Sequence, residues 1–357
     1  MSIRVFIIDD SAVVRKVLTD ILTAAAGIEV IGSAQDPIFA LAHMEKNWPD
    51  VITLDIEMPR MDGITFLKKI MLERPTPIVM CSTLTEKGSK ASLDALRLGA
   101  IDVVAKPKSD VKTSLPESSR DLVNAIKVAA KANMAVLKPM PIARISPTRN
   151  KFNADAMLEK GQKLGVKKAG SLIAIGASTG GTQALAAVLA ALPSNTLPIL
   201  IVQHMPAQFT QAFAKRLNEV SRVEVKEAED NDALLPGLVL IAPGGKHMML
   251  QVTQFGASVK IKDGPPVNRH KPSVDVLFRS VAKYAGADAL GIIMTGMGDD
   301  GAVGIKEMRD VGAKTIAQNE ETCVVYGMPA VAVKLGGIDH VLALSKIPQM
   351  IVQHRRV

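Results

Sequence analysis

The sequence predicts an α/β protein built from two units, and three observations lead to this prediction. The chain has 357 residues, more than one ordinary domain needs and suited to two of roughly 100–200 residues each. Short apolar runs alternate with helical patterns in both halves, which is typical of doubly wound parallel sheets. A basic, proline-containing stretch without periodicity separates the halves. We therefore expect a five-stranded doubly wound domain in residues 1–135, a flexible basic linker in 136–168, and a Rossmann-like α/β domain with a small antiparallel insert in 169–357.

The first domain is predicted from five repeats of a strand followed by a helix. The expected strands are Ile3–Ile8, Ile28–Ser33, Val51–Leu54, Ile78–Cys81 and Asp102–Ala105. The expected helices are Ala12–Ala25, Pro37–Lys46, Gly63–Glu73, Lys87–Leu98 and Glu117–Leu137. Right-handed crossovers between parallel strands bring the carboxyl ends of all strands to one edge of the sheet.

Polar side chains collect at that predicted edge. They are Asp9, Asp10, Asp55, Ser82, Thr83 and Lys106. Singly, such residues have ordinary structural roles as helix caps or turns. Together, converging carboxylates repel one another unless a hard cation joins them, and Mg²⁺ with oxygen ligands fits that need. A carboxylate in this setting can accept a phosphoryl group, and Asp55 is the predicted acceptor.

The second domain opens with an apolar strand from Ser171 and continues the alternation. Its further expected helices are Thr182–Leu192, Ala207–Val220, Val274–Tyr284 and Ala302–Val311. Its further expected strands are Leu197–Val202, Val223–Lys226, Leu238–Ala242, Ala289–Met294 and Lys314–Ala317. Met248–Val252 and Val259–Lys262 are expected to pair as a hairpin, and a strand and a helix between His340 and Val352 close the domain.

The segment from Ser171 to Thr182 reads as a strand, a glycine turn and a helix start, and it spells G-x-S-x-G around Ser178. Small residues beside the serine allow the sharp turn that holds a nucleophilic hydroxyl clear of a sheet. A similar pattern occurs in dinucleotide-binding folds, where an acidic residue closes the next strand. Here that strand ends in Gln203-His204, which favours acyl transfer over a dinucleotide-dependent reductase.

A serine nucleophile needs a neighbouring base, and that base needs an orienting acid. The candidate bases are His204, His247 and His270, and His204 is preferred because it follows the strand next to that of Ser178. The turn M-T-G-M-G-D-D-G offers Asp299 and Asp300, and both are chemically suited to be the acid. The resulting order of serine, histidine and aspartate differs from the order in α/β-hydrolases, so a standard member of that fold is not expected.

Composition narrows the remaining classes of function. The formal net charge is +8, but the linker region 138–170 alone carries +6, and the chain has only one Trp and two Tyr, so a nucleic-acid partner is not expected. Cys81 and Cys323 are far apart and are predicted to be buried free thiols. The apolar run Ala184–Leu192 is too short to span a bilayer, and no signal peptide is evident, so we expect a cytoplasmic protein without membrane insertion.

Residues 1–125 resemble the receiver domains of response regulators. The resemblance is carried by the acidic pair Asp9-Asp10, by L-D-I-E-M-P-R-M-D-G around Asp55, and by Lys106-Pro107. It implies that Asp55 accepts phosphate from a histidine kinase and that Asp10 and Asp55 hold Mg²⁺. It also implies that Ser82 is the switch hydroxyl, with Thr83 as the open alternative.

The second domain resembles the catalytic domain of the chemotaxis protein-glutamate methylesterases, the CheB family. The shared motifs are G-A-S-T-G-G-T, V-Q-H-M-P, K-D-G-P-P-V-N-R-H, T-G-M-G-D-D-G and A-Q-N-E. The resemblance implies that Ser178 is the nucleophile, His204 the base and Asp300 the orienting acid, with Asp299 at a variable position of its motif. The elbow geometry predicts the backbone N–H of Thr179 as an oxyanion donor, and the family suggests that of Met297.

The resemblance also implies an activity and partners. The expected reaction releases methanol from methylated glutamates of methyl-accepting chemotaxis receptors and deamidates receptor glutamines, without a cofactor for the ester chemistry. We expect the unphosphorylated receiver to cover the edge that carries Ser178 and phosphorylation to weaken that docking. The main alternative is a phosphorylation-gated interaction module with a vestigial hydrolase site.

Overall fold

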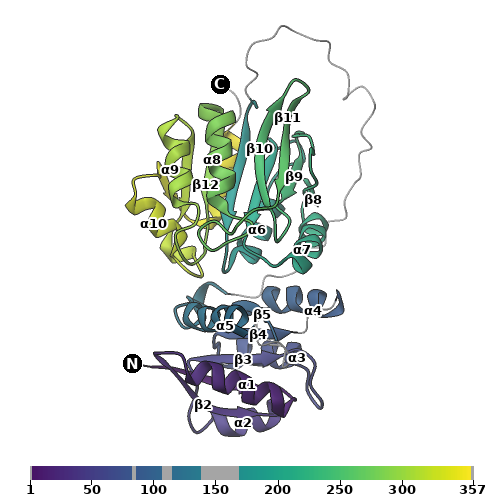
Figure 1. Cartoon of the computed structure of the whole chain (residues 1–357), viewed down its shortest axis with the longest axis vertical. Coiled ribbons are helices and arrows are strands. Elements are labelled where there is room, and N and C mark those ends of the chain that lie inside the picture. Colours follow the sequence, from purple (N-terminus) through teal and green to yellow (C-terminus); the bar gives the residue numbers. More distant parts are fainter. Residues whose placement is uncertain (1, 83–85, 107–114, 138–168, 355–357) are drawn as a thin grey trace.

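The computed structural model describes residues 2–82, 86–106, 115–137 and 169–354, and each half of the chain forms its own parallel sheet (Figure 1). The first sheet has the order β2-β1-β3-β4-β5, and all its strands are parallel. The strands are β1 (Ile3–Ile8), β2 (Ile28–Ala34), β3 (Val51–Asp55), β4 (Ile78–Ser82) and β5 (Asp102–Ala105). The strand order reverses between β1 and β3, and ligands bind at such switch points, beyond the carboxyl ends of the strands.

Three helices of the first domain begin directly after residues whose side chains cap them. The helices are α1 (Ala12–Thr23), α2 (Pro37–Met44), α3 (Gly63–Glu73), α4 (Glu86–Arg97) and α5 (Leu115–Ala129). The side chains of Ser11, Asp36 and Asp62 accept hydrogen bonds from backbone N–H groups in the first turns of α1, α2 and α3.

The predicted extension of the fifth helix to Leu137 is wrong. Helix α5 ends at Ala129, and a separate 3₁₀ turn, η1, covers Met134–Val136. The backbone N–H of Asn133 donates to the carbonyl of Val324 in the second domain at 2.9 Å, and the Asn133 side chain caps η1. A tertiary contact therefore interrupts a pattern that continues apolar in the sequence.

The second sheet has seven parallel strands in the order β14-β13-β12-β6-β7-β9-β8. Its strands are β6 (Leu172–Ala177), β7 (Ile199–Gln203), β8 (Glu224–Glu227), β9 (Leu238–Ile241), β12 (Ala289–Ile293), β13 (Lys314–Gln318) and β14 (His340–Leu342). The antiparallel insert is the predicted hairpin, formed by β10 (His247–Thr253) and β11 (Gly256–Lys262). The chain fills the sheet in one direction from β6 and in the other from β12, so the switch point lies between these two strands.

Helices cover both faces of this sheet, and the two faces are built from alternate strand residues. Ile173 and Ile175 pack on one face with α6 (Gly181–Ala190), α7 (Ala207–Val220) and α11 (Ile347–Gln353). Leu172 and Ala174 pack on the other face with α8 (Val274–Tyr284), α9 (Ala302–Asp310), α10 (Met328–Lys334) and the hairpin. Helix α10 was not predicted, because it has only seven residues and Pro329 lies in its first turn.

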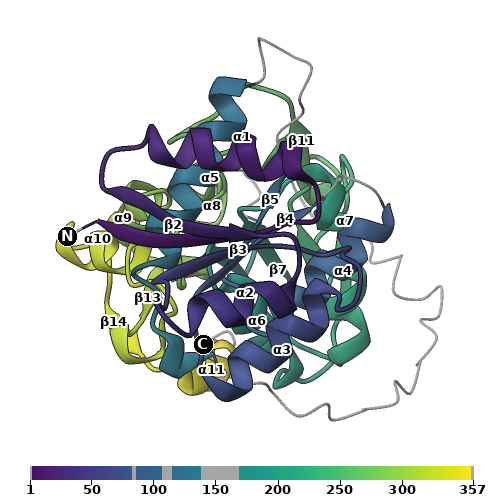
Figure 2. The ribbon, with the colours of Figure 1, turned by 90° about the horizontal axis from the view of Figure 1, so that it is seen from below.

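The two domains contact each other through α4 of the receiver-like half (Figures 1 and 2). Leu93 of α4 is buried in the core on the α6–α7 face of the second sheet. Arg216 of α7 contacts Asp94 at 3.3 Å, and the side chain of Gln183 in α6 donates to the carbonyl of Leu96. Because α6 begins at Gly181, in the turn that follows Ser178, the contact with Gln183 places the first domain near the predicted nucleophile.

Two further expectations concern thiols and membranes. Cys81 and Cys323 are free and buried, as predicted, and burial raises the pKa of each thiol to about 12. Across the residues for which the structure gives a conformation, we find no helix with the length and apolarity needed to cross a bilayer. The predicted linker falls almost entirely on residues 138–168, which are outside the described residues.

Candidate active site and phosphoacceptor site

The Ser178 turn has the tight geometry that its small residues predict. Strand β6 ends at Ala177, and α6 begins at Gly181 behind a left-handed residue, Gly180, whose φ is 78°. The N–H of Ser178 donates to the carbonyl of Thr295 at 3.0 Å, and the Ser178 carbonyl accepts from Gly181 N–H at 2.7 Å. These bonds fix the backbone of Ser178 between β6 and the loop after β12, at the switch point of the sheet.

Gln203 connects the turn of Ser178 with that of His204. Its buried side-chain Nε2 donates to the Ser178 carbonyl at 2.9 Å and to the His204 carbonyl at 3.1 Å. A Cβ at Gly181 would lie 2.1 Å from Gln203 Oε1, so this close approach requires glycine. The sequence does not predict this bridging role of Gln203.

His204 meets Asp300, and the contact decides which ring nitrogen is free. Nε2 of His204 lies 2.8 Å from Oδ2 of Asp300, while the buried Nδ1 has no hydrogen-bond partner among the described residues. A carboxylate only accepts, so Nε2 carries the proton and Nδ1 carries the lone pair. The structure contains no hydrogen bond from the Ser178 hydroxyl to this nitrogen, although the two residues follow adjacent strands, β6 and β7.

Asp300 is fully buried, and both of its carboxylate oxygens accept hydrogen bonds. Oδ1 accepts from the Ser273 hydroxyl at 2.7 Å and from Asn268 Nδ2 at 3.1 Å, and Oδ2 accepts from Val274 N–H at 2.7 Å as well as from His204. Burial alone would raise the pKa of Asp300, but the bonds from His204, Ser273 and Val274 outweigh it and lower the pKa to about 2. Asp300 is therefore held as an anion.

Asp299 and the other candidate histidines have different surroundings. The Asp299 side chain is exposed and lies 3.7 Å from Arg269. Nε2 of His247 lies 3.0 Å from the Pro265 carbonyl, and its Nδ1 accepts from Ser273 N–H at 3.2 Å, so both nitrogens are engaged in the fold. The ring of His270 stacks on that of His204.

The predicted oxyanion donors lie on two loops that contact each other beside Ser178. A Cβ at Gly296 would lie 2.7 Å from Cβ of Ser178, so the loop after β12 touches the serine. The Thr295 hydroxyl donates to the Thr179 carbonyl at 2.9 Å. In the part of the chain that the structure describes, the N–H groups of Thr179 and Met297 donate to no protein acceptor, which leaves both available for a substrate oxygen.

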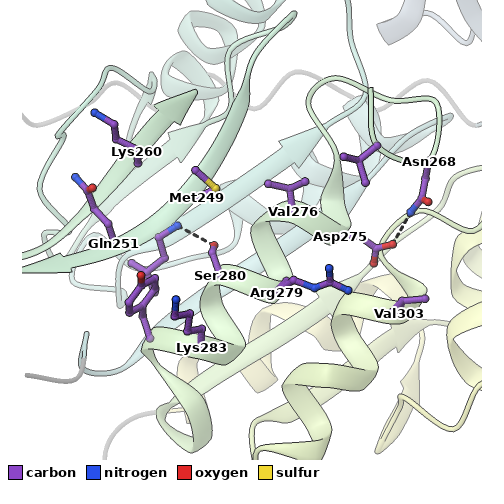
Figure 3. A pocket seen from close by; sticks show the side chains of 13 residues that line it. Met249, Gln251, Lys260, Asn268, Asp275, Val276, Arg279, Ser280, Lys283 and Val303 are labelled. Carbon is purple, nitrogen blue, oxygen red and sulfur yellow. Dashed lines mark hydrogen bonds between the residues drawn. The ribbon is translucent and has the colours of Figure 1, made fainter. Parts of the chain in front are cut away.

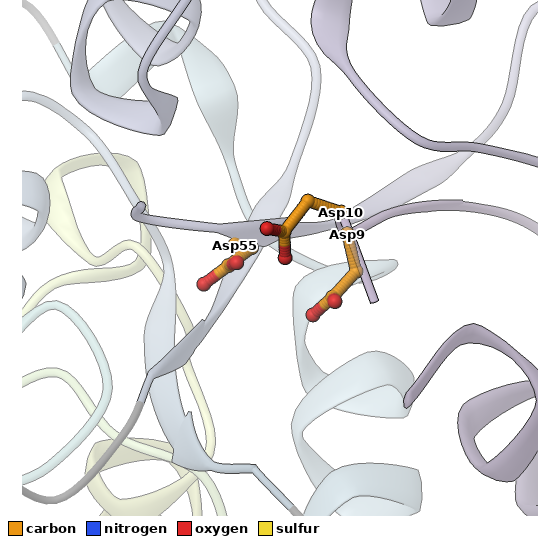
Figure 4. Close-up of side chains that lie close together, drawn as sticks. All are labelled: Asp9, Asp10 and Asp55. Atoms are coloured by element: carbon orange, nitrogen blue, oxygen red, sulfur yellow. The ribbon is translucent and has the colours of Figure 1, made fainter. Parts of the chain in front are cut away.

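The acidic cluster of the first domain assembles as the sequence predicts. Asp9, Asp10 and Asp55 each offer a carboxylate oxygen, and these oxygens lie within 4.8 Å of one another (Figure 4). Nζ of Lys106 lies 2.8 Å from Asp9 and 2.7 Å from Asp55. Three hard oxygen donors with one lysine suit Mg²⁺, which takes carboxylates and water in octahedral geometry.

Asp55 is buried at the end of β3. Burial raises its pKa, Lys106 opposes that rise, and the neighbouring Asp9 carboxylate adds to it. Asp10 is exposed, and Ser82 ends β4 as a buried residue, directly after Cys81, which pairs with Asp55. Thr83, the alternative switch hydroxyl, lies outside the described residues.

A separate cavity of about 610 Å³ lies between the hairpin and the outer side of α8 (Figure 3). Its walls include Met249, Arg279 and Lys283, and neither Ser178 nor His204 lines it. Asn268 and Asp275 line its edge and bond to each other, and Asn268 also bonds to Asp300. The cavity therefore adjoins the support of the histidine but is not the reaction site.

Comparison with known proteins identifies the family of both halves. The CheB methylesterase family matches residues 173–351, and the response regulator receiver domain family matches residues 5–115. The chain belongs to the CheB methylesterase family.

Several relatives match nearly the whole chain. Protein-glutamate methylesterase/protein-glutamine glutaminase 2 of Chromobacterium violaceum is 58% identical over 98% of this chain and 99% of its own length. Protein-glutamate methylesterase/protein-glutamine glutaminase 3 of Shewanella oneidensis is 56% identical over 98% of both chains. The crystal structure of the Thermotoga maritima CheB methylesterase catalytic domain is 38% identical, with a TM-score of 0.51, and the match covers 52% of the present chain and 98% of the Thermotoga chain.

Proposed function

We propose that this chain is a phosphorylation-activated serine hydrolase. It removes methyl esters from glutamate side chains of chemoreceptors, releasing methanol, and deamidates specific receptor glutamines. The names of its whole-length relatives support the substrate class. The observation that carries the proposal is the His204 imidazole, because Asp300 occupies its Nε2 while its Nδ1 keeps a free lone pair beside the strand that carries Ser178.

In the proposed reaction, Ser178 attacks the side-chain carbonyl of the methylated glutamate and His204 Nδ1 accepts the hydroxyl proton. Asp300 keeps Nε2–H in place and stabilises the imidazolium that forms. The N–H groups of Thr179 and Met297 donate to the oxyanion of the tetrahedral intermediate. His204 returns its proton to the leaving methoxide, and water activated by the same nitrogen then hydrolyses the acyl-enzyme.

The ring nitrogens have exchanged roles relative to the Ser-His-Asp template, in which Nε2 faces the serine and Nδ1–H faces the aspartate. Here Nε2–H faces Asp300. The chemistry is unchanged, because either nitrogen can be the base when the other is held as a donor.

The receiver half supplies the control. We infer that Asp55 accepts a phosphoryl group from a chemotaxis histidine kinase, that Asp10 and Asp55, beside Asp9, hold Mg²⁺, and that Lys106 contacts the phosphoryl oxygens. Bound Mg²⁺ would neutralise charge on those oxygens. Ser82, at the end of β4, is the proposed switch hydroxyl.

Inhibition by docking is the proposed link between the two halves. The contacts of α4 with Gln183 and Arg216 lie at the helices that follow Ser178 and His204, so an undocked receiver would free the approach to both. A difference of about 1–3 kcal/mol between docked and undocked states would change activity about 5–150-fold. The proposed place of action is the cytoplasm, where the kinase and the receptor helices would be met, without insertion into the membrane.

Methanol release from methylated receptor membranes tests the proposal. We expect release by the wild type and its loss, by at least about 10⁴-fold, in Ser178→Ala. The same assay with glutamine-bearing receptor should give ammonia. Unchanged methanol release in Ser178→Ala, or none from the wild type with a small phosphodonor, would favour an interaction module with a vestigial site.

A further inference from the structure

A second imidazole covers one face of the proposed base. The rings of His204 and His270 are stacked with their centroids 3.7 Å apart and their planes 5° from parallel. His204 follows β7, whereas His270 comes from the loop between β11 and α8, so the pairing joins distant parts of the chain. This face-to-face contact is close enough to fix the plane of the His204 ring.

The loop holds His270 in place by several independent restraints. Val267 and His270 exchange two backbone hydrogen bonds, at 3.0 and 2.9 Å. Between them, Asn268 and Arg269 both adopt left-handed conformations, with φ of 49° and 70°. The Asn268 side chain anchors the turn to Asp300, the same carboxylate that holds His204. One acid therefore aligns both the base and the loop that carries the stacked ring.

We propose that His270 is a positioning residue of the esterase, which holds the His204 ring in the plane that directs Nδ1 toward Ser178 and keeps water from one face of that ring. The inference rests on the proposed function. His270 would then be a fourth side chain of the active site, beside Ser178, His204 and Asp300. Asp300 fixes the ring only at Nε2, about which the imidazole can still rotate, and the stack removes that remaining freedom.

The charge of His270 must stay neutral for this role, because a cation stacked on His204 would oppose the imidazolium formed during the reaction. Burial is the main cause that lowers the pKa of His270 to about 4, and His204 and Arg269 lower it further against the opposing effect of Asp300. The other charged groups of this loop are paired: Arg269 lies 3.7 Å from Asp299, and Lys271 lies 2.9 Å from Asp263. His270 is therefore uncharged at neutral pH.

The test compares His270→Ala with His270→Phe in the full chain, with methylated receptor and a phosphodonor. We expect kcat to fall about 10–100-fold in His270→Ala with KM little changed, since only the alignment of the base is lost. His270→Phe keeps a flat ring and should retain kcat within about threefold. The pH profile of kcat/KM should also change in His270→Ala but not in His270→Phe, because only the alanine opens one face of the His204 ring to water. His43→Phe, a change of an exposed receiver histidine, is the matched control and should match the wild type.

A second measurement does not depend on turnover. Nitrogen-15 NMR of the imidazoles should show one tautomer of His204, protonated at Nε2, in the wild type and in His270→Phe, and a mixture in His270→Ala. Wild-type kcat, pH profile and tautomer in His270→Ala would overturn the inference. Equal loss in the Phe and Ala variants would do the same. Absent methanol release from the wild type would instead reject the proposed function, and the NMR comparison would still decide the role of His270.

Discussion

Asp55 and Asp300 are buried carboxylates at the carboxyl edges of two parallel sheets, yet their environments have opposite effects. Burial raises the pKa of Asp55, and its main donor, Lys106, is shared with Asp9. Asp300 is buried as well, but bonds from His204, Ser273 and Val274 lower its pKa to about 2. Both side chains are buried, so the opposite directions of their pKa shifts follow from the number of hydrogen bonds that each carboxylate accepts. An under-satisfied carboxylate suits a group that must gain a cation and a phosphoryl group, and a saturated one suits a fixed orienting anion.

Asp300→Asn should have the largest effect on this contrast. The amide can donate to His204, which favours the tautomer with the proton on Nδ1 and removes the base. We expect kcat for methanol release to fall about 10³–10⁴-fold. Asp299→Asn is the matched control, because the Asp299 side chain is exposed and lies beside Arg269, and the variant should stay within about threefold of the wild type. Similar losses in both variants would refute the assignment of Asp300 as the orienting acid.

Asp55→Asn should remove the response to phosphorylation while leaving the unstimulated rate. The wild type is expected to gain about 5–150-fold in methanol release with a small phosphodonor and Mg²⁺, and Asp55→Asn should gain nothing. Chelation of the metal should have the same result in the wild type. A stimulated Asp55→Asn protein would mean that a different group accepts the phosphoryl group.

The sequence predicts where Asp55 and Asp300 lie, but not the hydrogen-bond donors that make their pKa values differ. The apolar runs show where strands end, so the gathering of Asp9, Asp55 and Lys106 could be predicted. The meeting of His204 with the Asp299-Asp300 turn could be predicted in the same way, whereas the choice of Asp300 came from the family resemblance. The donors that set the two pKa values come from elsewhere. Ser273 and Val274 reach Asp300 from the start of α8, and no pattern in the sequence relates them to it.

The same limit explains what the sequence missed around the base. Among the described residues, three features depend on loop conformations: the free lone pair on Nδ1 of His204, the hydrogen bonds of Gln203 and the stacking of His270. These loops include two residues with left-handed backbones, which secondary-structure propensities do not predict. Helix α5 was predicted too long for a related reason, since the contact of Asn133 with Val324 joins residues far apart in the chain. The strands could therefore be predicted from local sequence patterns, whereas the surroundings of His204 depend on contacts between residues far apart in the chain.

The depressed pKa of Asp300 also predicts a dependence of stability on pH. An acid whose pKa falls from 3.8 to about 2 on folding stabilises the fold above pH ~4, and this contribution is lost as the pH falls toward ~2. Its size is roughly 2 kcal/mol. Asp300→Asn should therefore unfold at a lower Tm than the wild type at pH 7, with the difference shrinking below pH ~4. Calorimetry across this range checks the prediction, and a difference that stays constant with pH would contradict it.

The smallest expected effect concerns the contact that joins the two sites. Leu93 of α4 is 6% exposed and lies in the core of the second domain, so a glutamate there places a charge in an apolar interface and should loosen docking. We expect Leu93→Glu to release methanol a few-fold faster than the wild type without phosphodonor, and to respond less to it. Leu72→Glu, on an exposed receiver leucine, should behave as the wild type. If Leu93→Glu folds normally but shows the unstimulated wild-type rate, then the docking of α4 does not restrain the Ser178 site, and the two carboxylates must be coupled through another contact, such as that of Asn133 with Val324 beside the loop of Gly296.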